Sequence, residues 1–499
     1  MAIATRTSQG KVLSPARTSG ASTRKTLSCL FQMALMVVTL LFVLTIGNGS
    51  SWDSFIFWCR YGTVAAIAAL VLYSFEVGKF LTPMMLVMIS FVVFQFGIPI
   101  LYGFAANYSN YYAGFLNASL LTTGAAFTVV CIQAFVLGAS LARRTCVPKP
   151  RDRRGSFFEK PFLRDSESVT QIAGIGFVLT GLVAIPRALM FFLTSLASGI
   201  GAARVTYELG GIENIARGFF VPLGLLLLVY LPRGRRRNLV FAVLFVYSAL
   251  AALSGDRTEG LTLMVALIYF MFGFGSGKAH KTSRTIGLVA GLLIVVWLLV
   301  FVANTRVGGS GSGITLGDAL VSALNEMGFN ALTIDYEIAN APKTTYGLSY
   351  LAALTSLIPN SLDFAGVKDA LDFLNPTSNY YTTMGYQYNW ATFGLGYSLI
   401  AESYVNFGYC GFLAIGVIGA IMERLMSWGG DTPFERYLSL VFLWSFLTLP
   451  RRQMTWLVNA FEYDLLFVLL ILWVWYSLVV THRSGSKQYS SAREGGEAL

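Results

Sequence analysis

A small set of arginines has the chemistry to bind a phosphorylated ligand. The set is Arg204, Arg257, Arg306, Arg451 and Arg452, each at or just beyond the end of an apolar stretch. A guanidinium group is always charged and can donate two parallel hydrogen bonds to a phosphate. One such arginine alone would more readily pair with a nearby acid, as Arg257 could with Glu259. The whole set, in a chain with only 12% charged residues, favours a binding site for an anion such as pyrophosphate.

Two carboxylates are the leading candidates for acid–base chemistry among nine acids expected at the outer face. The nine are Glu208, Asp256, Glu259, Glu326, Asp335, Glu337, Glu402, Glu462 and Asp464. Glu402 is the only charge in the segment SLIAESYVNFGYCGF, which follows Gly394 and Gly396. These two glycines with Gly408 and Gly411 predict a short helix that enters the membrane face and breaks before the next span. A charge in such apolar surroundings costs free energy unless it has a partner. Asp256 lies beside Arg257 in SGDRTEG. Either carboxylate could accept a proton from a hydroxyl, as glycosyl transfer requires. The alternative for Glu402 is a solvated cap at the start of a helix that enters the membrane.

Aromatic side chains that could stack on sugar rings gather in one polar stretch. They are Tyr380, Tyr381, Tyr386 and Tyr388, and Trp390 close by is as well explained by the aromatic belt of a membrane interface. On the same face we find no Asp-x-Asp pair to hold a metal with a nucleotide sugar. The two histidines, His280 and His482, have no metal-binding partners in sequence. We therefore expect neither a metal nor a cofactor.

The composition indicates an integral membrane protein. Of 499 residues, 55% are hydrophobic, and a run of about 20 apolar residues is enough to cross a bilayer. We predict an all-α polytopic protein with about 12 transmembrane helices. The predicted spans are 27–46, 61–76, 83–104, 117–141, 168–195, 216–231, 238–253, 260–275, 286–304, 397–427, 436–449 and 463–480.

Lys and Arg in alternate loops predict the orientation. The basic loops and both basic tails belong in the cytoplasm, so the net charge of +11 reflects topology and membrane lipid rather than nucleic acid. Residues 1–26 are predicted to be a disordered cytoplasmic tail, 27–304 a bundle of about nine spans, and 305–395 a large periplasmic loop. Residues 396–480 should form a re-entrant segment and the last three spans. Residues 481–499 are a second cytoplasmic tail.

Several of these segments carry a resemblance to a known family. They are SLIAESYVNFGYCGF with its glycine-rich approach, the GDRTEG turn, and Arg306 at the opening of the large loop. Together they resemble the bacterial oligosaccharide repeat-unit polymerases, also called O-antigen polymerases or the Wzy family. Arg306 and Gly317 also match an Arg-x10-Gly pattern of external loops in some members. The resemblance covers most of the chain as architecture.

The resemblance implies a multi-span glycosyltransferase of GT-C-like architecture in the bacterial inner membrane. Such an enzyme transfers the growing glycan from undecaprenyl pyrophosphate to a new lipid-linked repeat unit, at the periplasmic face and without a metal. Arg257, Arg306 and Arg204 would then bind the donor pyrophosphate, and Glu402 would orient the acceptor or act as base. A chain-length regulator protein would be a further partner.

Three alternatives stay open at this point. A flippase or other transporter of lipid-linked oligosaccharides would place charges along a path through the bundle, whereas these lie at the outer face. An O-antigen ligase is expected to use a periplasmic histidine, and neither histidine is predicted to lie there. A single-sugar transferase would favour paired acids in the first outer loop, which offers only Asp53.

Overall fold

The computed structural model describes most of the chain, and every regular element in the described part is helical. The described residues are 15–46, 49–79, 81–105, 108–109, 116–143, 160–206, 211–254, 257–274, 281–306, 316–340, 344–358, 366–371, 374, 397–427 and 432–479. The all-helical prediction is thus confirmed for these residues.

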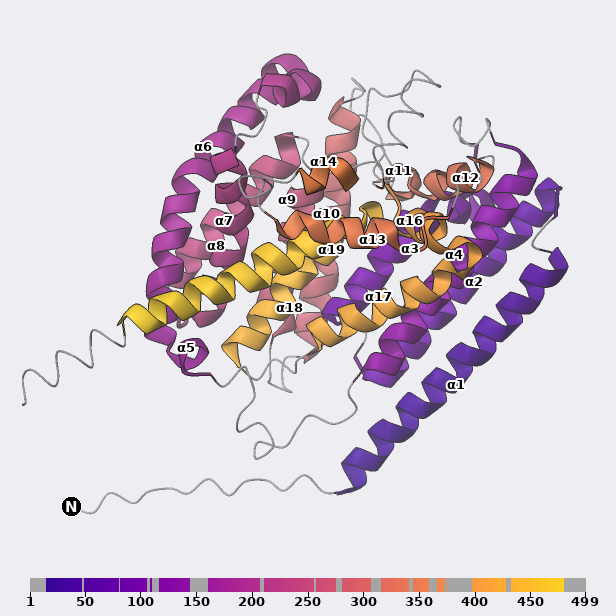
Figure 1. Cartoon of the computed structure of the whole chain (residues 1–499), viewed down its shortest axis with the longest axis horizontal. Helices are drawn as coiled ribbons and strands as arrows, with labels where there is room; N and C mark the ends of the chain where they lie inside the picture. Colours follow the sequence, from indigo (N-terminus) through magenta and orange to yellow (C-terminus); the bar gives the residue numbers. More distant parts are fainter. Residues whose placement is uncertain are drawn as a thin grey trace, which may run out of the picture.

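The described residues up to 306 form ten α-helices. They are α1 (Pro15–Ile46), α2 (Trp52–Val77), α3 (Pro83–Phe104), α4 (Ala118–Ala142), α5 (Pro161–Arg164), α6 (Ser166–Thr206), α7 (Gly211–Tyr230), α8 (Arg235–Ser254), α9 (Arg257–Gly273) and α10 (Lys281–Arg306). Helix α1 lies along one edge of the bundle and α6 along the opposite edge (Figure 1). Residues 15–26, predicted as disordered tail, are instead the start of α1, because the apolar helix continues outward from the span.

The second part begins with short elements from the predicted periplasmic loop. They are α11 (Leu316–Gly328), α12 (Ala331–Asn340), α13 (Leu348–Ala353), the 3-10 helix η4 (Leu354–Leu357) and α14 (Val367–Leu371). These elements lie together across one end of the bundle, at the top of Figure 1. The chain then forms α16 (Leu399–Phe407), η7 (Gly408–Cys410), α17 (Gly411–Met426), α18 (Pro433–Phe446), η8 (Leu449–Arg451), α19 (Met454–Phe461) and the π-helical turn η9 (Glu462–Phe467).

Eight of the described helical segments are long and apolar enough to cross a membrane. They overlap the predicted spans that begin at 27, 61, 83, 117, 168, 238, 397 and 463. The other four predicted spans coincide with the helices α7, α9, α10 and α18. A polytopic helical membrane protein is therefore the architecture of this chain.

The predicted break near Glu402 is present in the structure. Ser398 caps the start of α16, where its hydroxyl accepts a hydrogen bond from the backbone N–H of Ala401. Helix α16 ends at Gly408, whose φ of 57° is a left-handed conformation that side chains disfavour. A new helix, α17, starts at Gly411. The sequence thus forms a short helix, a tight turn and a long apolar helix.

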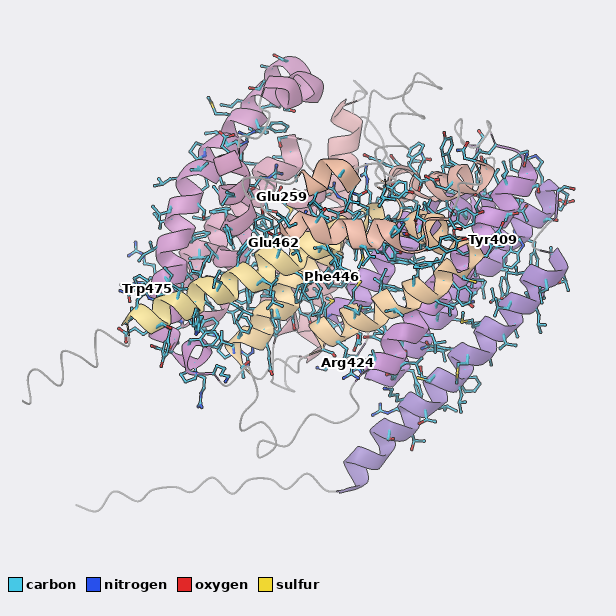
Figure 2. The ribbon with its side chains drawn as sticks, viewed as in Figure 1. Glu259, Tyr409, Arg424, Phe446, Glu462 and Trp475 are labelled. Atoms are coloured by element: carbon cyan, nitrogen blue, oxygen red, sulfur yellow. The ribbon has the colours of Figure 1, made fainter. Side chains whose placement is uncertain are left out.

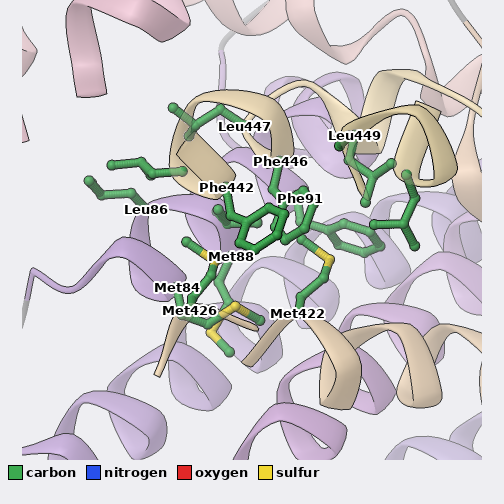
Figure 3. Close-up of a cluster of buried hydrophobic side chains, with 14 of the residues drawn as sticks. Met84, Leu86, Met88, Phe91, Met422, Met426, Phe442, Phe446, Leu447 and Leu449 are labelled. Atoms are coloured by element: carbon green, nitrogen blue, oxygen red, sulfur yellow. The ribbon is translucent and has the colours of Figure 1, made fainter. Parts of the chain in front are cut away.

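Close helix packing in the centre depends on small residues. A Cβ atom on Gly138 of α4 would lie 2.0 Å from the backbone oxygen of Gly416 of α17, and one on Gly419 would lie 2.3 Å from the oxygen of Phe135. In membranes such small residues let two backbones approach, since apolar burial gives little driving force there. Beside this crossing, buried rings and thioethers of α3, α17 and α18 form a cluster that includes Phe91, Met422 and Phe446 (Figure 3).

A methyl group at this crossing should destabilise the fold. We expect Gly419→Ala to lower the free energy of unfolding by roughly 1–3 kcal/mol, because the added carbon overlaps the backbone of α4. Gly174→Ala in α6 is the control, since its Cβ would meet nothing within 4 Å. Thermal unfolding of the two purified variants would test this. Equal stability of both variants would contradict the close approach.

Candidate active site

A cavity of about 470 Å³ lies among α7, α9, α18 and α19. Its lining combines two arginines, two carboxylates and three large aromatic rings. The lining residues are Arg217, Gly218, Glu259, Thr262, Trp444, Ser445, Thr448, Arg452, Trp456, Asn459, Ala460, Tyr463 and Asp464. Helix α19 also packs against α13 and η4, which come from the predicted periplasmic loop. The cavity therefore lies toward the end of the bundle that carries this loop.

One side of the cavity carries an ion pair between two helices. Arg217 of α7 pairs with Glu259 of α9, and the hydroxyl of Tyr247 donates a 2.8 Å hydrogen bond to the other oxygen of Glu259. The Arg217 side chain is 31% exposed, so part of its guanidinium is accessible from the cavity. Glu259 neutralises the arginine in a protein region where an unpaired charge would be costly. An anionic ligand could share this arginine.

The other side carries Arg452, which stacks on an indole. Its guanidinium carbon lies 4.4 Å from the centre of the Trp456 ring, a cation–π contact within α19 and the turn before it. The indole nitrogen of Trp456 donates a 3.3 Å hydrogen bond to the carbonyl of Ser445 on α18. This hydrogen bond to α18 holds the Trp456 ring, on which Arg452 stacks, in place. The stacked arginine keeps a defined direction, as a receptor for a phosphate requires.

A local irregularity brings an acid into the cavity. Residues Glu462–Phe467 form a π-helical turn, which inserts an extra residue and is frequent at functional sites. Tyr463 and Asp464 of this turn line the cavity. One carboxylate oxygen of Asp464 accepts a hydrogen bond from Ser445, and the described residues offer no donor to the other oxygen. This second oxygen is available to accept a proton.

The turn that carries Arg451 and Arg452 is held by buried polar groups from distant segments. The Gln95 amide of α3 donates to the carbonyl of Pro450, and the backbone N–H of Tyr397 donates to the carbonyl of Arg451 over 3.3 Å. Ser398 in turn donates to Gln95. We call Gln95, Tyr397, Ser398 and Glu402 the turn clamp.

Glu402 is the central member of the turn clamp. It is 1% exposed, and its carboxylate accepts a 2.6 Å hydrogen bond from the backbone N–H of Met454, the first residue of α19. The other oxygen accepts a 3.0 Å bond from Ser349 of α13. A carboxylate is favourable at a helix N-terminus, where backbone N–H groups lack partners. Glu402 is thus a buried cap of α19 rather than a solvated one, and it lies outside the cavity lining.

The other predicted site residues divide into three groups. Arg451 ends the η8 turn, and Arg452 follows it into the cavity. Arg204 is the third residue from the end of α6, Arg257 is the first residue of α9, and Arg306 is the last residue of α10. Only the backbones of these three arginines are described, and their side chains lie outside the described part. Asp256, Tyr380, Tyr381, Tyr386 and Tyr388 also lie outside the described residues. In Figure 2, Glu259 and Glu462 mark the cavity region and Arg424 the opposite end of the bundle.

Sequence reasoning missed Arg217 and the three rings as site residues, and it named Asp464 only as one of nine acids expected at the outer face. Arg217 had a signal, since it is a charge inside the predicted span 216–231 and intramembrane charges are by default functional. The rings of Trp444, Trp456 and Tyr463 had none, because aromatic residues are common throughout apolar helices. Only the packing of α18 against α7 and α9, and of η9 against α7, brings them together.

Two further buried acids lie on α12, outside the membrane spans. Asp335 and Glu337 are 6% and 8% exposed, and Tyr397 of the turn clamp donates a 3.1 Å hydrogen bond to Glu337. Burial raises the pKa of Glu337 to about 7, although the bond from Tyr397 opposes the shift. Burial also raises the pKa of Asp335 well above its ordinary value. Glu337 therefore titrates near neutral pH in the folded protein.

The fold and the cavity together define a class of protein. A polytopic helical membrane protein with an arginine-, acid- and ring-lined cavity at one end is suited to act on an anionic, sugar-bearing substrate at the membrane surface. A family model, O-antigen polysaccharide polymerase Wzy, matches residues 31–483, so the chain belongs to this family. The resemblance found in the sequence is confirmed. The protein joins repeat units into O-antigen polysaccharide, a part of lipopolysaccharide. No curated protein and no solved structure matches the chain significantly.

Two substitutions of Glu402 separate a positioning role from a catalytic one. Glu402→Gln can still accept from Met454 and exchange a hydrogen bond with Ser349, so we expect polymer length close to that of the wild type. Glu402→Ala leaves buried donors without partners and should cost roughly 3 kcal/mol of stability, with loss of polymer. Polymer length and thermal unfolding of both variants check this. Loss of polymer in the Gln variant at unchanged stability would instead make Glu402 the base.

The acid on α12 predicts a pH dependence of stability. A pKa raised from 4.5 to about 7 means that the folded state favours protonated Glu337. Its contribution is therefore fully present below pH 4.5 and is lost as the pH rises through 7, by roughly 3 kcal/mol in total. Glu337→Gln should flatten this part of the stability curve. Thermal unfolding of both proteins between pH 5 and pH 8 is the measurement, and parallel curves would contradict the assignment.

Proposed function

We propose that this cavity is the polymerase active site and that its donor is a glycan on undecaprenyl pyrophosphate. The observation that carries the proposal is the meeting of Arg217 and Arg452 with Asp464 and aromatic rings in one cavity. The acceptor is a second lipid-linked repeat unit. The reaction takes place at the periplasmic face of the bacterial inner membrane, and both termini are cytoplasmic. Support for this orientation comes from the basic loops and from the loop helices at the cavity end.

The arginines take the role of a metal in this proposal. When the bond between the anomeric carbon of the donor glycan and the pyrophosphate oxygen breaks, the electron pair of this bond moves to the pyrophosphate oxygen. Arg217 and Arg452 stabilise the resulting charge by hydrogen bonds and Coulomb attraction. Arg451 lies next to Arg452, and Arg257 precedes Glu259 by two residues, so both extend the positive surroundings. Arg204 and Arg306, at the ends of α6 and α10, are proposed to contact the donor at the membrane surface.

Asp464 is the proposed base. Only one of its oxygens receives a hydrogen bond among the described residues, whereas Glu259 uses one oxygen for Arg217 and one for Tyr247. Asp464 therefore accepts the proton of the acceptor hydroxyl as the hydroxyl oxygen attacks the anomeric carbon. The new glycosidic bond forms while the bond to pyrophosphate breaks. Asp256, next to Arg257, is the alternative base.

The rings of the cavity are proposed to hold sugars near the reacting atoms. Trp444, Trp456 and Tyr463 offer flat apolar faces, and their polar edges can hydrogen-bond to hydroxyls. Tyr380, Tyr381, Tyr386 and Tyr388 extend this surface in the proposal toward more distant sugars.

The complete architecture in this proposal has about 12 spans of the GT-C-like type. The helices α7, α9, α10 and α18 add to the eight candidate spans, and three of these four, α7, α9 and α18, line the cavity. A chain-length regulator is a proposed partner at the periplasmic loop.

Arginine substitutions test the phosphate contact. We expect Arg217→Lys and Arg452→Lys each to lower the polymerisation rate about tenfold or more, because lysine keeps the charge but loses the two-donor fork. Arg424→Lys, at the opposite end of the bundle, is the matched control and should keep the wild-type rate. The assay is the conversion of lipid-linked repeat units to polymer by purified protein. Wild-type rates in both cavity variants would reject the proposed donor contacts.

The base is tested by Asp464→Asn, which keeps size and can still accept a hydrogen bond from Ser445. We expect loss of polymerisation of about a hundredfold or more, with unchanged thermal unfolding. The rate in the variant should also lose the pH dependence on the acid side. An active Asp464→Asn variant together with an inactive, folded Asp256→Asn variant would assign the base to Asp256.

A further inference from the structure

A second cavity, with none of the lining residues of the candidate active site, lies on the surface formed by α6, α7 and α8. It is an open groove of about 830 Å³. Most of its lining is apolar and includes Phe177, Val178, Leu227, Leu239 and Val243. Three of the lining side chains are strongly exposed, Val178 at 60%, Leu182 at 68% and Leu239 at 65%. The groove therefore opens to the lipid rather than to the interior of the bundle.

Glycines on α6 create the space of the groove. Gly174 and Gly181 both line it and lie two helical turns apart on one face. A Cβ atom on Gly174 would meet nothing within 4 Å, whereas one on Gly181 would touch the ring of Phe220. The glycine at 174 thus leaves an open slot between α6 and its neighbours. A slot of this kind fits an unbranched hydrocarbon chain.

One end of the groove carries a positive charge. Arg236, the second residue of α8, lines it and is exposed. The described ion pairs do not include Arg236. Neighbouring Arg237 differs, since its guanidinium lies 5.6 Å from the ring of Phe270. The only acid in the lining is Glu167, so the basic block Arg233–Arg237 gives this end a net positive charge.

The groove is long enough to hold an acyl chain of one leaflet. Its lining runs on α7 from Phe220 to Leu231, about 16 Å, and on α6 from Glu167 to Pro186, about 28 Å, at 1.5 Å per residue. One acyl chain covers half of a hydrocarbon core of roughly 30 Å, so it fits along either wall from the charged end. The charged end belongs to the cytoplasmic side by the positive-inside rule.

We propose that this groove is a binding site for an anionic phospholipid of the cytoplasmic leaflet. One acyl chain occupies the slot at Gly174, and the headgroup phosphate contacts Arg236. The site is independent of the proposed polymerase chemistry, because the groove and the cavity at Arg217 share no lining residue.

Binding of phosphatidylglycerol to the purified full-length protein tests the headgroup contact. The experiment measures bound lipid by native mass spectrometry, with phosphatidylcholine as the zwitterionic comparison. We expect Arg236→Gln to bind phosphatidylglycerol about fivefold more weakly. Arg235→Gln removes the same charge one residue away, outside the lining, and should bind within roughly twofold of the wild type. Equal losses in the two variants would show only a general attraction to the basic block and would overturn the site.

Filling the slot tests the acyl-chain contact. Gly174→Phe should abolish the preference for phosphatidylglycerol over phosphatidylcholine, whereas Ile175→Phe, on the exposed neighbouring face, should retain it. Unchanged thermal unfolding shows that both variants fold. If Gly174→Phe does not fold, Arg236→Gln still tests the site. Retained binding in Gly174→Phe would overturn the proposal. Displacement of phosphatidylglycerol by equimolar undecaprenyl phosphate would assign the groove to the polyprenyl lipid instead.

Discussion

The arrangement of the candidate active site depends on buried hydrogen bonds to one short turn. The turn between α18 and α19 carries Arg451 and Arg452, and in the membrane its free carbonyl and N–H groups would be costly without partners. The turn clamp supplies them from α3 and α16, through Gln95, Tyr397 and Glu402. Because these donors and acceptors come from segments far apart in sequence, the turn can form only when α3, α16 and α19 are all in place. The position of Arg452 is therefore a property of the whole bundle.

The same constraint explains why the charges of the site occur in pairs or contacts. Arg217 faces Glu259, Arg452 stacks on Trp456, and Asp464 accepts from Ser445. Each contact lowers the cost of a polar group at this depth. A partly exposed guanidinium or a carboxylate oxygen without a donor is what a charged substrate needs. The π-helical turn also helps to place the acid, since its extra residue directs Asp464 toward the cavity, whereas a regular helix would turn Asp464 away from it.

The sequence predicted the helical class, most element positions and the break at Gly408, because apolar runs and glycines act locally. It also singled out Arg452 and Glu402 as unusual charges. It did not predict what Glu402 contacts, because Met454 and Ser349 are about fifty residues away on either side and only tertiary packing brings them to its carboxylate. It also did not predict that Arg217 and Asp464 line one cavity. Their meeting depends on how α7 and α9 pack against α18 and how α7 packs against η9, which no local pattern encodes.

The central claim is that a lipid-linked pyrophosphate substrate binds in the cavity among α7, α9, α18 and α19. Its most direct test is photocrosslinking of a tagged undecaprenyl-pyrophosphate-linked repeat unit to a photoreactive residue at Asn459, which lines the cavity. The same residue at Leu470, 51% exposed on the continuation of this helix, reports contact with bulk lipid. The account predicts a crosslink at position 459 that is lost when undecaprenyl pyrophosphate is added. Any crosslink at position 470 should persist in the presence of undecaprenyl pyrophosphate. Crosslinking at 470 alone, or an undisplaced crosslink at 459, would contradict it.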